Sequence, residues 1–281
     1  MSTEEISPAA INFKPTEKSL EKLNIVKMAL KKPRGASIGL DYRPSFGSKS
    51  DGGISVLSMQ LRQSKAAAIW TKDSSSVSGL AKEQSSAMGN FPGPCPVIYW
   101  GSLDDEDSND VLSNVVQGGA TAIVLDYNEE VDSSLVDSMG DVGVIWKVSS
   151  LDQMQKSSEK GMGDIFLLSD EFLKSIDPET AKESLSSLSK SIVTIAPLAS
   201  MQPQNNELAT GKQYASMGIS SLLFESCCVG DDEDFKYAQF AVDGISKKAS
   251  SSFSMTGLTG STNGHFGTSS HGREVKWLRC S

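Results

Sequence analysis

Eight short apolar runs recur along the chain, and they constrain its fold more than any other feature. Each run is rich in β-branched or aromatic residues and is typical of a strand buried on both faces. The runs begin roughly 20 to 30 residues apart, which leaves room for one helix and two loops between neighbours. They cover residues 37–42, 65–70, 96–100, 120–125, 142–148, 164–168, 192–197 and 219–224.

The segments between the runs have helical signals. Asp177, Pro178 and Glu179 are typical of an N-cap, a first-turn proline and a first-turn acid. The acidic residues 231–234 similarly precede a helical pattern that extends to residue 245. Eight strands alternating with helices predict an α/β protein with a closed (β/α)8 TIM barrel. An open doubly wound sheet is the alternative, but no glycine-rich phosphate fingerprint follows the first run.

Two regions lie outside this pattern. Residues 16–31 predict an extra amphipathic helix, with its apolar positions at Leu20, Leu23, Ile25, Met28 and Leu30. Residues 249–264 form a Ser/Thr/Gly tract that cannot build a core. We therefore expect an N-terminal arm and helix at 1–33, a barrel at 34–248, and a disordered or extended C-terminal tail at 249–281.

Composition excludes several classes of function. A net charge of −9 argues against a nucleic-acid partner, which requires a positive footprint. The longest apolar runs are too short for a membrane span, and the acidic start resembles neither a signal peptide nor a transit peptide. The four cysteines show no metal spacing. We expect no cofactor, no metal site, and a soluble acidic protein.

The order and spacing of the segments resemble the indole-3-glycerol-phosphate synthase family from about residue 16 to residue 248. That resemblance implies a (β/α)8 barrel with an extra N-terminal helix and a phosphate-binding active site. It rests on the extra helix, on Pro44-Ser45, and on residues 66–69, 96–98, 118–124 and 218–223.

The catalytic residues that the resemblance implies are absent from the matching positions. Trp100 stands where the family has the lysine of strand three, and Lys147 stands where it has the glutamate of strand five. Glu225 replaces the phosphate-binding glycine of strand eight, next to a retained serine. The motifs of strands one, six and seven fall on residues 39–41, 168–170 and 197–199, without a match.

Tryptophan has no proton that titrates near neutral pH, and a carboxylate beside a phosphate repels it. We therefore expect a barrel without indole-3-glycerol-phosphate synthase activity that is not an enzyme but a scaffold or linker subunit of a larger assembly. We expect that assembly to be a plastid complex of the photosynthetic apparatus, with the cytoplasm as the alternative location. The partners would be protein subunits bound by the N-terminal arm and the tail, because Trp and Arg dominate interface energetics. The expected partner-binding residues are Phe266, Arg273, Trp277, Leu278 and Arg279.

The alternative is an active barrel enzyme of the lyase or aldolase type, acting on a small anionic or carbonyl substrate. In that reading Lys147 is a desolvated nucleophile or base, with Asp170 or Glu225 as its partner. In the scaffold reading Trp100 plugs the barrel mouth, and Lys147 forms an internal ion pair with Glu225. A chromophore on Cys95, Cys227, Cys228 or Cys280 is left open.

Overall fold

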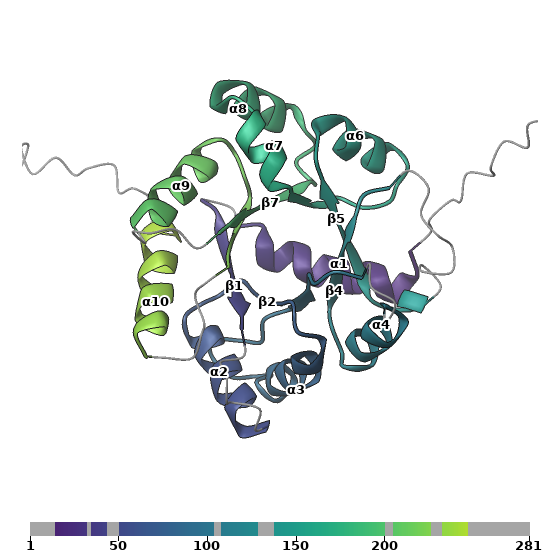
Figure 1. The fold of residues 1–281 in the computed structure, drawn as a ribbon, viewed down its shortest axis with the longest axis vertical. Coiled ribbons are helices and arrows are strands. Elements are labelled where there is room, and N and C mark those ends of the chain that lie inside the picture. Colours follow the sequence, from purple (N-terminus) through teal and green to yellow (C-terminus); the bar gives the residue numbers. More distant parts are fainter. Residues whose placement is uncertain are drawn as a thin grey trace, which may run out of the picture. The chain divides into compact units, whose positions relative to one another are not determined.

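The computed structural model describes residues 15–32, 35–43, 51–103, 108–128, 138–199, 205–225 and 232–246. Eight parallel strands pair in sequence order, and β8 also pairs with β1, so the sheet closes into a barrel (Figure 1). The predicted α/β TIM barrel is thus confirmed. The strands are β1 Ser37–Tyr42, β2 Ala68–Thr71, β3 Val97–Tyr99, β4 Ala122–Asp126, β5 Gly143–Val148, β6 Ile165–Leu168, β7 Val193–Leu198 and β8 Ser221–Phe224.

Helices surround the barrel (Figure 1). Asp177 caps the helix that its sequence predicted, since its carboxylate accepts hydrogen bonds from the backbone N–H groups of Glu179 and Thr180, both at 3.1 Å. The helices are α1 Glu17–Leu30, α2 Asp51–Gln63, α3 Val77–Ser86, α4 Ser108–Gln117, α6 Leu151–Glu159, α7 Asp170–Ser175, α8 Pro178–Ser187, α9 Asn205–Ser216 and α10 Asp232–Ser246, with a short 3-10 helix η1 at Ser74–Ser76.

The strand boundaries differ most from expectation at β2, which begins at Ala68 rather than at residue 65. Lys65 has a φ of +62°, and its N–H donates to the carbonyl of Arg62. The N–H of Ala66 reaches back to the carbonyl of Leu61. The first residues of this apolar run therefore end helix α2 instead of starting the strand.

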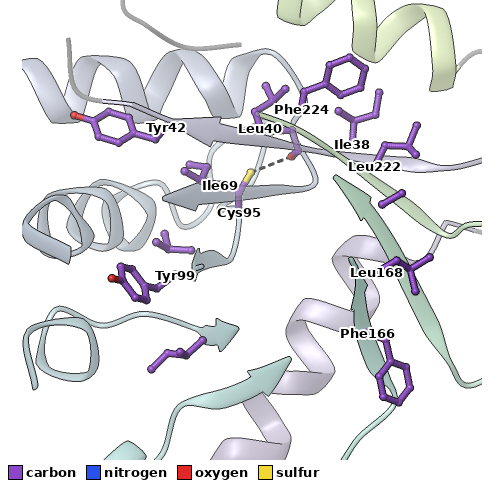
Figure 2. Close-up of a cluster of buried hydrophobic side chains, with 14 of the residues drawn as sticks. Ile38, Leu40, Tyr42, Ile69, Cys95, Tyr99, Phe166, Leu168, Leu222 and Phe224 are labelled. Atoms are coloured by element: carbon purple, nitrogen blue, oxygen red, sulfur yellow. Dashed lines mark hydrogen bonds between the residues drawn. The ribbon is translucent and has the colours of Figure 1, made fainter. Parts of the chain in front are cut away.

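Alternation along the strands builds two cores. Outward side chains such as Ile38, Leu40 and Phe166 pack under the helices (Figure 2). Inward side chains, among them Trp70 and Ile98, fill the barrel itself. The barrel interior is thus a packed core, as in other barrels of this kind.

Helix α1 closes the end of the barrel at which the strands begin. Leu23, Val26 and Leu30 are buried and join the interior cluster. The hydroxyl of Ser19 donates to the carbonyl of Val142, just before β5. The amphipathic helix is confirmed, but the expected apolar face is partly wrong, because three of its members are exposed: Leu20, Ile25 and Met28. The buried face of α1 consists of Ser19, Leu23, Val26 and Leu30.

Candidate active site

A pocket of about 380 Å³ opens at the end of the barrel where the strands finish. Every second residue of a strand points into the barrel, as Trp70 does. At the carboxyl ends of the strands, residues in these inward positions line the pocket. Val124 and Leu167 give the pocket an apolar floor. Its polar rim is formed by Lys72, Trp100, Ser102, Asp126, Lys147, Ser169, Asp170, Glu171 and Glu225.

Lys147 and Asp126 form the charged pair of the β4–β5 side. They are register partners on neighbouring strands, and Nζ of Lys147 lies 2.9 Å from Oδ1 of Asp126. The Lys147 side chain is 43% exposed. The expectation of a desolvated lysine is therefore wrong, because the side chain is exposed and its ammonium has a carboxylate beside it.

Five side chains on the opposite side form a closed circuit, which we call the Asp41 ring. Asp41 accepts hydrogen bonds from Nε of Arg43 and Nε1 of Trp100, both at 2.9 Å. Arg43 lies 3.6 Å from the carboxylate of Glu225, which in turn lies 3.8 Å from Nζ of Lys72. Lys72 completes the circuit, since its Nζ is 3.8 Å from the centre of the Trp100 ring.

The Asp41 carboxyl has the most perturbed protonation equilibrium in this part of the molecule. Its residue is only 1% exposed, and burial raises its pKa from 3.8 to about 6. The hydrogen bonds from Arg43 and Trp100 and the charges of Arg43 and Lys72 act in the opposite direction without cancelling the effect of burial. A carboxyl that titrates near neutral pH under a pocket wall is typical of functional sites.

The pocket brings together the three residues predicted for the enzyme alternative, Lys147, Asp170 and Glu225. The predicted ion pair between Lys147 and Glu225 is not the arrangement found, because Lys147 pairs with Asp126 and Glu225 lies between Arg43 and Lys72. Nor does Trp100 plug the mouth. Asp41 and Lys72 hold it as one wall of an open pocket.

Other strand-end residues behave as core or lie beside the site. Tyr42 and Tyr127 turn outward into the cluster under the helices, because each is one position out of phase with the inward residues. Glu171 was missed by the sequence interpretation. Its signal was available, since it directly follows Asp170 in the first turn of α7.

The predicted docking residues of the tail, 266–279, lie outside the described residues, as do Cys227, Cys228 and Cys280. Cys95 is described and buried, and its thiol donates to the carbonyl of Ala66 at 3.1 Å. Across the described ranges, the structure has no cluster of three or more His, Cys, Asp or Glu side chains suited to a metal ion. Among the helices described, none combines the length and apolarity that a membrane crossing needs.

No family model matches the chain, and no curated protein matches it in sequence. Solved structures do match its fold. Orotidine 5'-phosphate decarboxylase from Pyrococcus horikoshii has a TM-score of 0.50 at 12% identity, over 75% of this chain and 100% of that one. Thiamine phosphate pyrophosphorylase from Pyrococcus furiosus has a TM-score of 0.52 at 12% identity, over 79% and 98%. (S)-3-O-geranylgeranylglyceryl phosphate synthase from Thermoplasma acidophilum has a TM-score of 0.52 at 10% identity, over 81% and 97%.

At this identity the similarity establishes the (β/α)8 fold. It also corrects one expectation: the three matched barrels named above are enzymes, so the prediction that the chain is not an enzyme is not upheld. The scaffold role, the plastid location and the photosynthetic assembly receive no support from these matches. The chain thus has a (β/α)8 barrel in common with enzymes of several activities.

Proposed function

We propose that the chain is a lyase that makes or breaks a bond next to the carbonyl group of a small substrate. The observation that carries this proposal is the Lys147 ammonium, which lines the pocket at the carboxyl ends of the strands. Barrel enzymes keep their reacting groups at this end. An ammonium there can bind the carbonyl oxygen and stabilise the negative charge that develops on it.

The carboxylate of Asp126 decides how Lys147 acts. Its Oδ1 lies 2.9 Å from Nζ of Lys147, so the lysine forms an ion pair in which its N–H groups are hydrogen-bond donors. We therefore assign Lys147 the role of electrophile. It would donate to the substrate oxygen while Asp126 holds the ammonium in place.

A second carboxylate of the pocket would act as the base. In the cleavage direction it takes the proton of the substrate's β-hydroxyl, the bond between the α and β carbons breaks, and its electron pair moves to the carbonyl oxygen beside Lys147. Reprotonation at the α carbon then completes the reaction. Asp170 and Glu225 both line the pocket and are the two candidates for this base.

The charges around the pocket select the kind of substrate. Of the described lining residues, two are lysines and four are carboxylates: Lys72, Lys147, Asp126, Asp170, Glu171 and Glu225. Both lysines lie within 4 Å of a carboxylate. A phosphate dianion would meet more repulsion than attraction here. We propose a small carbonyl compound without a phosphate group.

The test is the exchange of α hydrogens for deuterium, followed by NMR, because breaking this bond and removing an α proton share the same enolate. The panel is pyruvate, hydroxyacetone and dihydroxyacetone, with dihydroxyacetone phosphate as the phosphorylated comparison. We expect exchange with at least one unphosphorylated ketone and a loss of about 100-fold or more in Lys147→Met. Lys160→Met, at the end of α6, is the matched control.

Two further experiments distinguish the role of the base from the role of Lys147. Asp170→Asn and Glu225→Gln identify the base by which of them loses exchange. Borohydride reduction in the presence of the ketone tests the electrophile role, because a covalent adduct on Lys147 would mean an imine and a nucleophilic lysine. Equal exchange in wild type and Lys147→Met, or no exchange by the wild type, would overturn the proposed function.

A further inference from the structure

The Asp41 ring occupies one continuous side of the barrel mouth. Asp41 lies on β1, and the other members directly follow β8, β1, β2 and β3, which are neighbours in the closed sheet. Two of the members are cationic and two are carboxylates, so their charges balance when Asp41 is ionised. Lys147 and Asp126 lie on β5 and β4, outside this ring.

Trp100 is the aromatic member of the ring that lines the pocket, and three contacts determine where it lies. Its Nε1 donates to Oδ1 of Asp41 at 2.9 Å. The Lys72 ammonium lies over its face, and the indole of Trp70 meets it edge-on at 6.3 Å between ring centres. Of these contacts, only the hydrogen bond to Asp41 is directional enough to fix the rotation of the indole.

Asp41 is also costly to keep. It is buried, and burying an ionised carboxylate has a higher desolvation cost than burying an uncharged group. The charge of Asp41 binds the guanidinium of Arg43, and Arg43 in turn lies 3.6 Å from Glu225. The carboxylate thus organises both the aromatic wall and the two charged groups beside it.

We propose that Asp41 is a positioning residue of the mouth pocket, which fixes Trp100 as a wall and, through Arg43 and Glu225, sets the position of the Lys72 ammonium. This inference rests on the proposed function only in taking the pocket as the place where substrate binds. Asp41 acts through its neighbours, since it is absent from the pocket lining while Trp100, Lys72 and Glu225 belong to it.

The proposal predicts a dependence on pH. The charged groups that face Asp41 are Arg43 directly after β1, Lys72 after β2 and, through Arg43, Glu225 after β8, with Trp100 as its uncharged partner. Protonation of Asp41 removes the charge that binds Arg43 and weakens the bond from the indole. Trp100 should therefore become less constrained as the pH falls through about 6.

The experiment measures the accessibility of Trp100 in the full chain. The Trp100 signal is the difference in fluorescence between the wild type and Trp100→Phe, each quenched with acrylamide. As the pH falls, we expect acrylamide quenching of Trp100 in the wild type to increase, with a midpoint near pH 6. In Asp41→Asn it should be high at neutral pH and independent of pH. Asp164→Asn is the matched control, because that carboxylate pairs with Lys27 at the other end of the barrel.

Trp100 quenching that is the same in Asp41→Asn and wild type, with the same pH midpoint, would overturn the inference. Circular dichroism and the melting temperature of each variant show whether it is folded. Asp41→Glu provides a second variant that keeps the charge while displacing the acceptor, and it should raise quenching at neutral pH without abolishing the pH dependence.

The two proposals fail separately. Quenching needs no substrate, so a missing ketone exchange in the wild type would overturn the lyase and leave the positioning role standing. Where exchange is present, Asp41→Asn should raise KM about tenfold or more with a smaller effect on kcat, because it disturbs binding and leaves Lys147 intact. A wild-type KM in this variant would contradict the positioning role even if Lys147→Met is inactive.

Discussion

The indole N–H of Trp100 donates a 2.9 Å hydrogen bond to the carboxylate of Asp41, and this bond joins the wall of the pocket to a side chain inside the barrel. A buried carboxylate destabilises a fold unless it is fully compensated. Asp41 is not fully compensated, because burial still raises its pKa to about 6. The barrel thus keeps a destabilising group at the place where its mouth is shaped.

Asp41→Asn should stabilise the protein at neutral pH. The native state binds the Asp41 proton more tightly than the unfolded chain, so the wild type loses stability as the pH rises from 3.8 to about 6. The difference between these pKa values corresponds to about 3 kcal/mol. Between about pH 4 and 7 the free energy of unfolding of the variant, relative to wild type, should rise by up to that amount.

Urea denaturation at several pH values measures this difference. Asp164→Asn is the control, since its carboxylate is 40% exposed and its ion pair with Lys27 should contribute less than about 1 kcal/mol. If Asp41→Asn and the wild type gave parallel profiles, the Asp41 carboxyl would have an ordinary pKa in the folded state.

Gly39→Ala should destabilise the barrel from within. A Cβ at residue 39 would lie 2.3 Å from Nε1 of Trp70, and the fully buried Trp70 ring cannot retreat. Overpacking of this kind costs about 1–3 kcal/mol. In the double variant with Trp70→Leu, the alanine should cost much less than in the wild-type background. Equal costs in both backgrounds would show that the indole is not the obstacle.

The periodicity of the sequence was sufficient to predict the barrel. Eight runs of about the same length and spacing fit a closed parallel sheet, and each of the observed strands begins within three residues of its run. The boundaries of the strands were less predictable, because apolar residues can also form a turn. Ala66 and Ala67 resemble strand residues, yet they lie in the connection between α2 and β2, which turns at Lys65 with its positive φ.

The pocket was predictable as a set of residues but not as a set of contacts. The period of two places Lys147 and Glu225 at inward strand ends, and both line the pocket. Which charged side chains form ion pairs depends on the register of the strands. Lys147 pairs with Asp126 because the two are register partners on adjacent strands, and the register cannot be read from the sequence. The burial that shifts the Asp41 carboxyl is likewise a property of the folded molecule.

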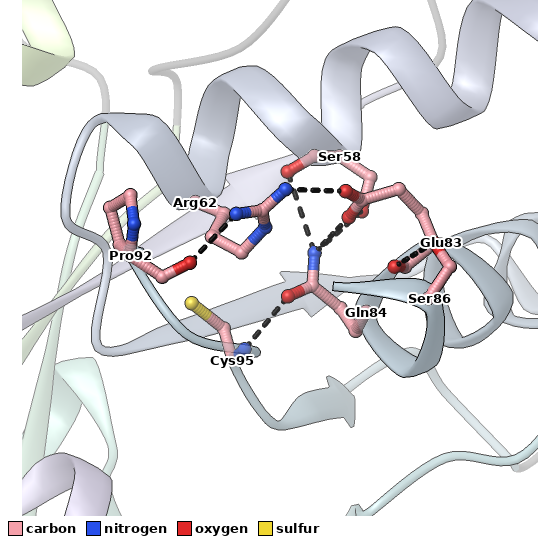
Figure 3. Close-up of polar contacts among 7 residues, drawn as sticks. All are labelled: Ser58, Arg62, Glu83, Gln84, Ser86, Pro92 and Cys95. Carbon is pink, nitrogen blue, oxygen red and sulfur yellow. Dashed lines mark hydrogen bonds and ion pairs between the residues drawn. The ribbon is translucent and has the colours of Figure 1, made fainter. Parts of the chain in front are cut away.

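Arg62→Met should be strongly destabilising. The guanidinium of Arg62 binds the carboxylate of Glu83 at 2.9 Å and the carbonyl of Pro92 at 2.7 Å, between α2, α3 and the loop before β3 (Figure 3). Both partners of the ion pair are at most 10% exposed. Breaking a buried pair leaves one charge uncompensated, at a cost of about 3 kcal/mol or more.

The free energy of unfolding measured in urea tests this ion pair. The control is Lys18→Met, because the Lys18–Asp141 pair is exposed and should contribute less than about 1 kcal/mol. The double variant Arg62→Met with Glu83→Leu should recover part of the loss, since no charge is then left buried. A loss in Arg62→Met no larger than in Lys18→Met would contradict the buried network.

Cys95 should be inert towards alkylation in the folded protein. Burial raises the pKa of its thiol to about 12, and the thiolate is the form that reacts. N-ethylmaleimide at neutral pH, followed by peptide mass spectrometry, should modify Cys95 only after denaturation. Labelling of the native protein at this residue, at the rate of a small thiol, would contradict both its burial and its hydrogen bond to Ala66.

Deletion of residues 249–281 should leave the barrel intact. Helix α10 ends at Ser246, and it already buries Ala238, Ala241, Val242 and Ile245 against the rest of the barrel. The melting temperature of the truncated chain should lie within about 2 °C of wild type. Deletion of residues 232–281, which also removes α10, is the control and should abolish cooperative unfolding, because it uncovers the outer core beside β1.

The same truncation tests the predicted docking role of the tail. We expect it to abolish recovery of a defined protein complex from native extract, and Trp277→Ala in the full chain to reduce that recovery, because buried Trp side chains dominate interface energies. The ketone exchange assigned to Lys147 should be the same with and without the tail. A drop of more than about 10 °C in melting temperature on truncation would instead mean that the tail packs on its own barrel.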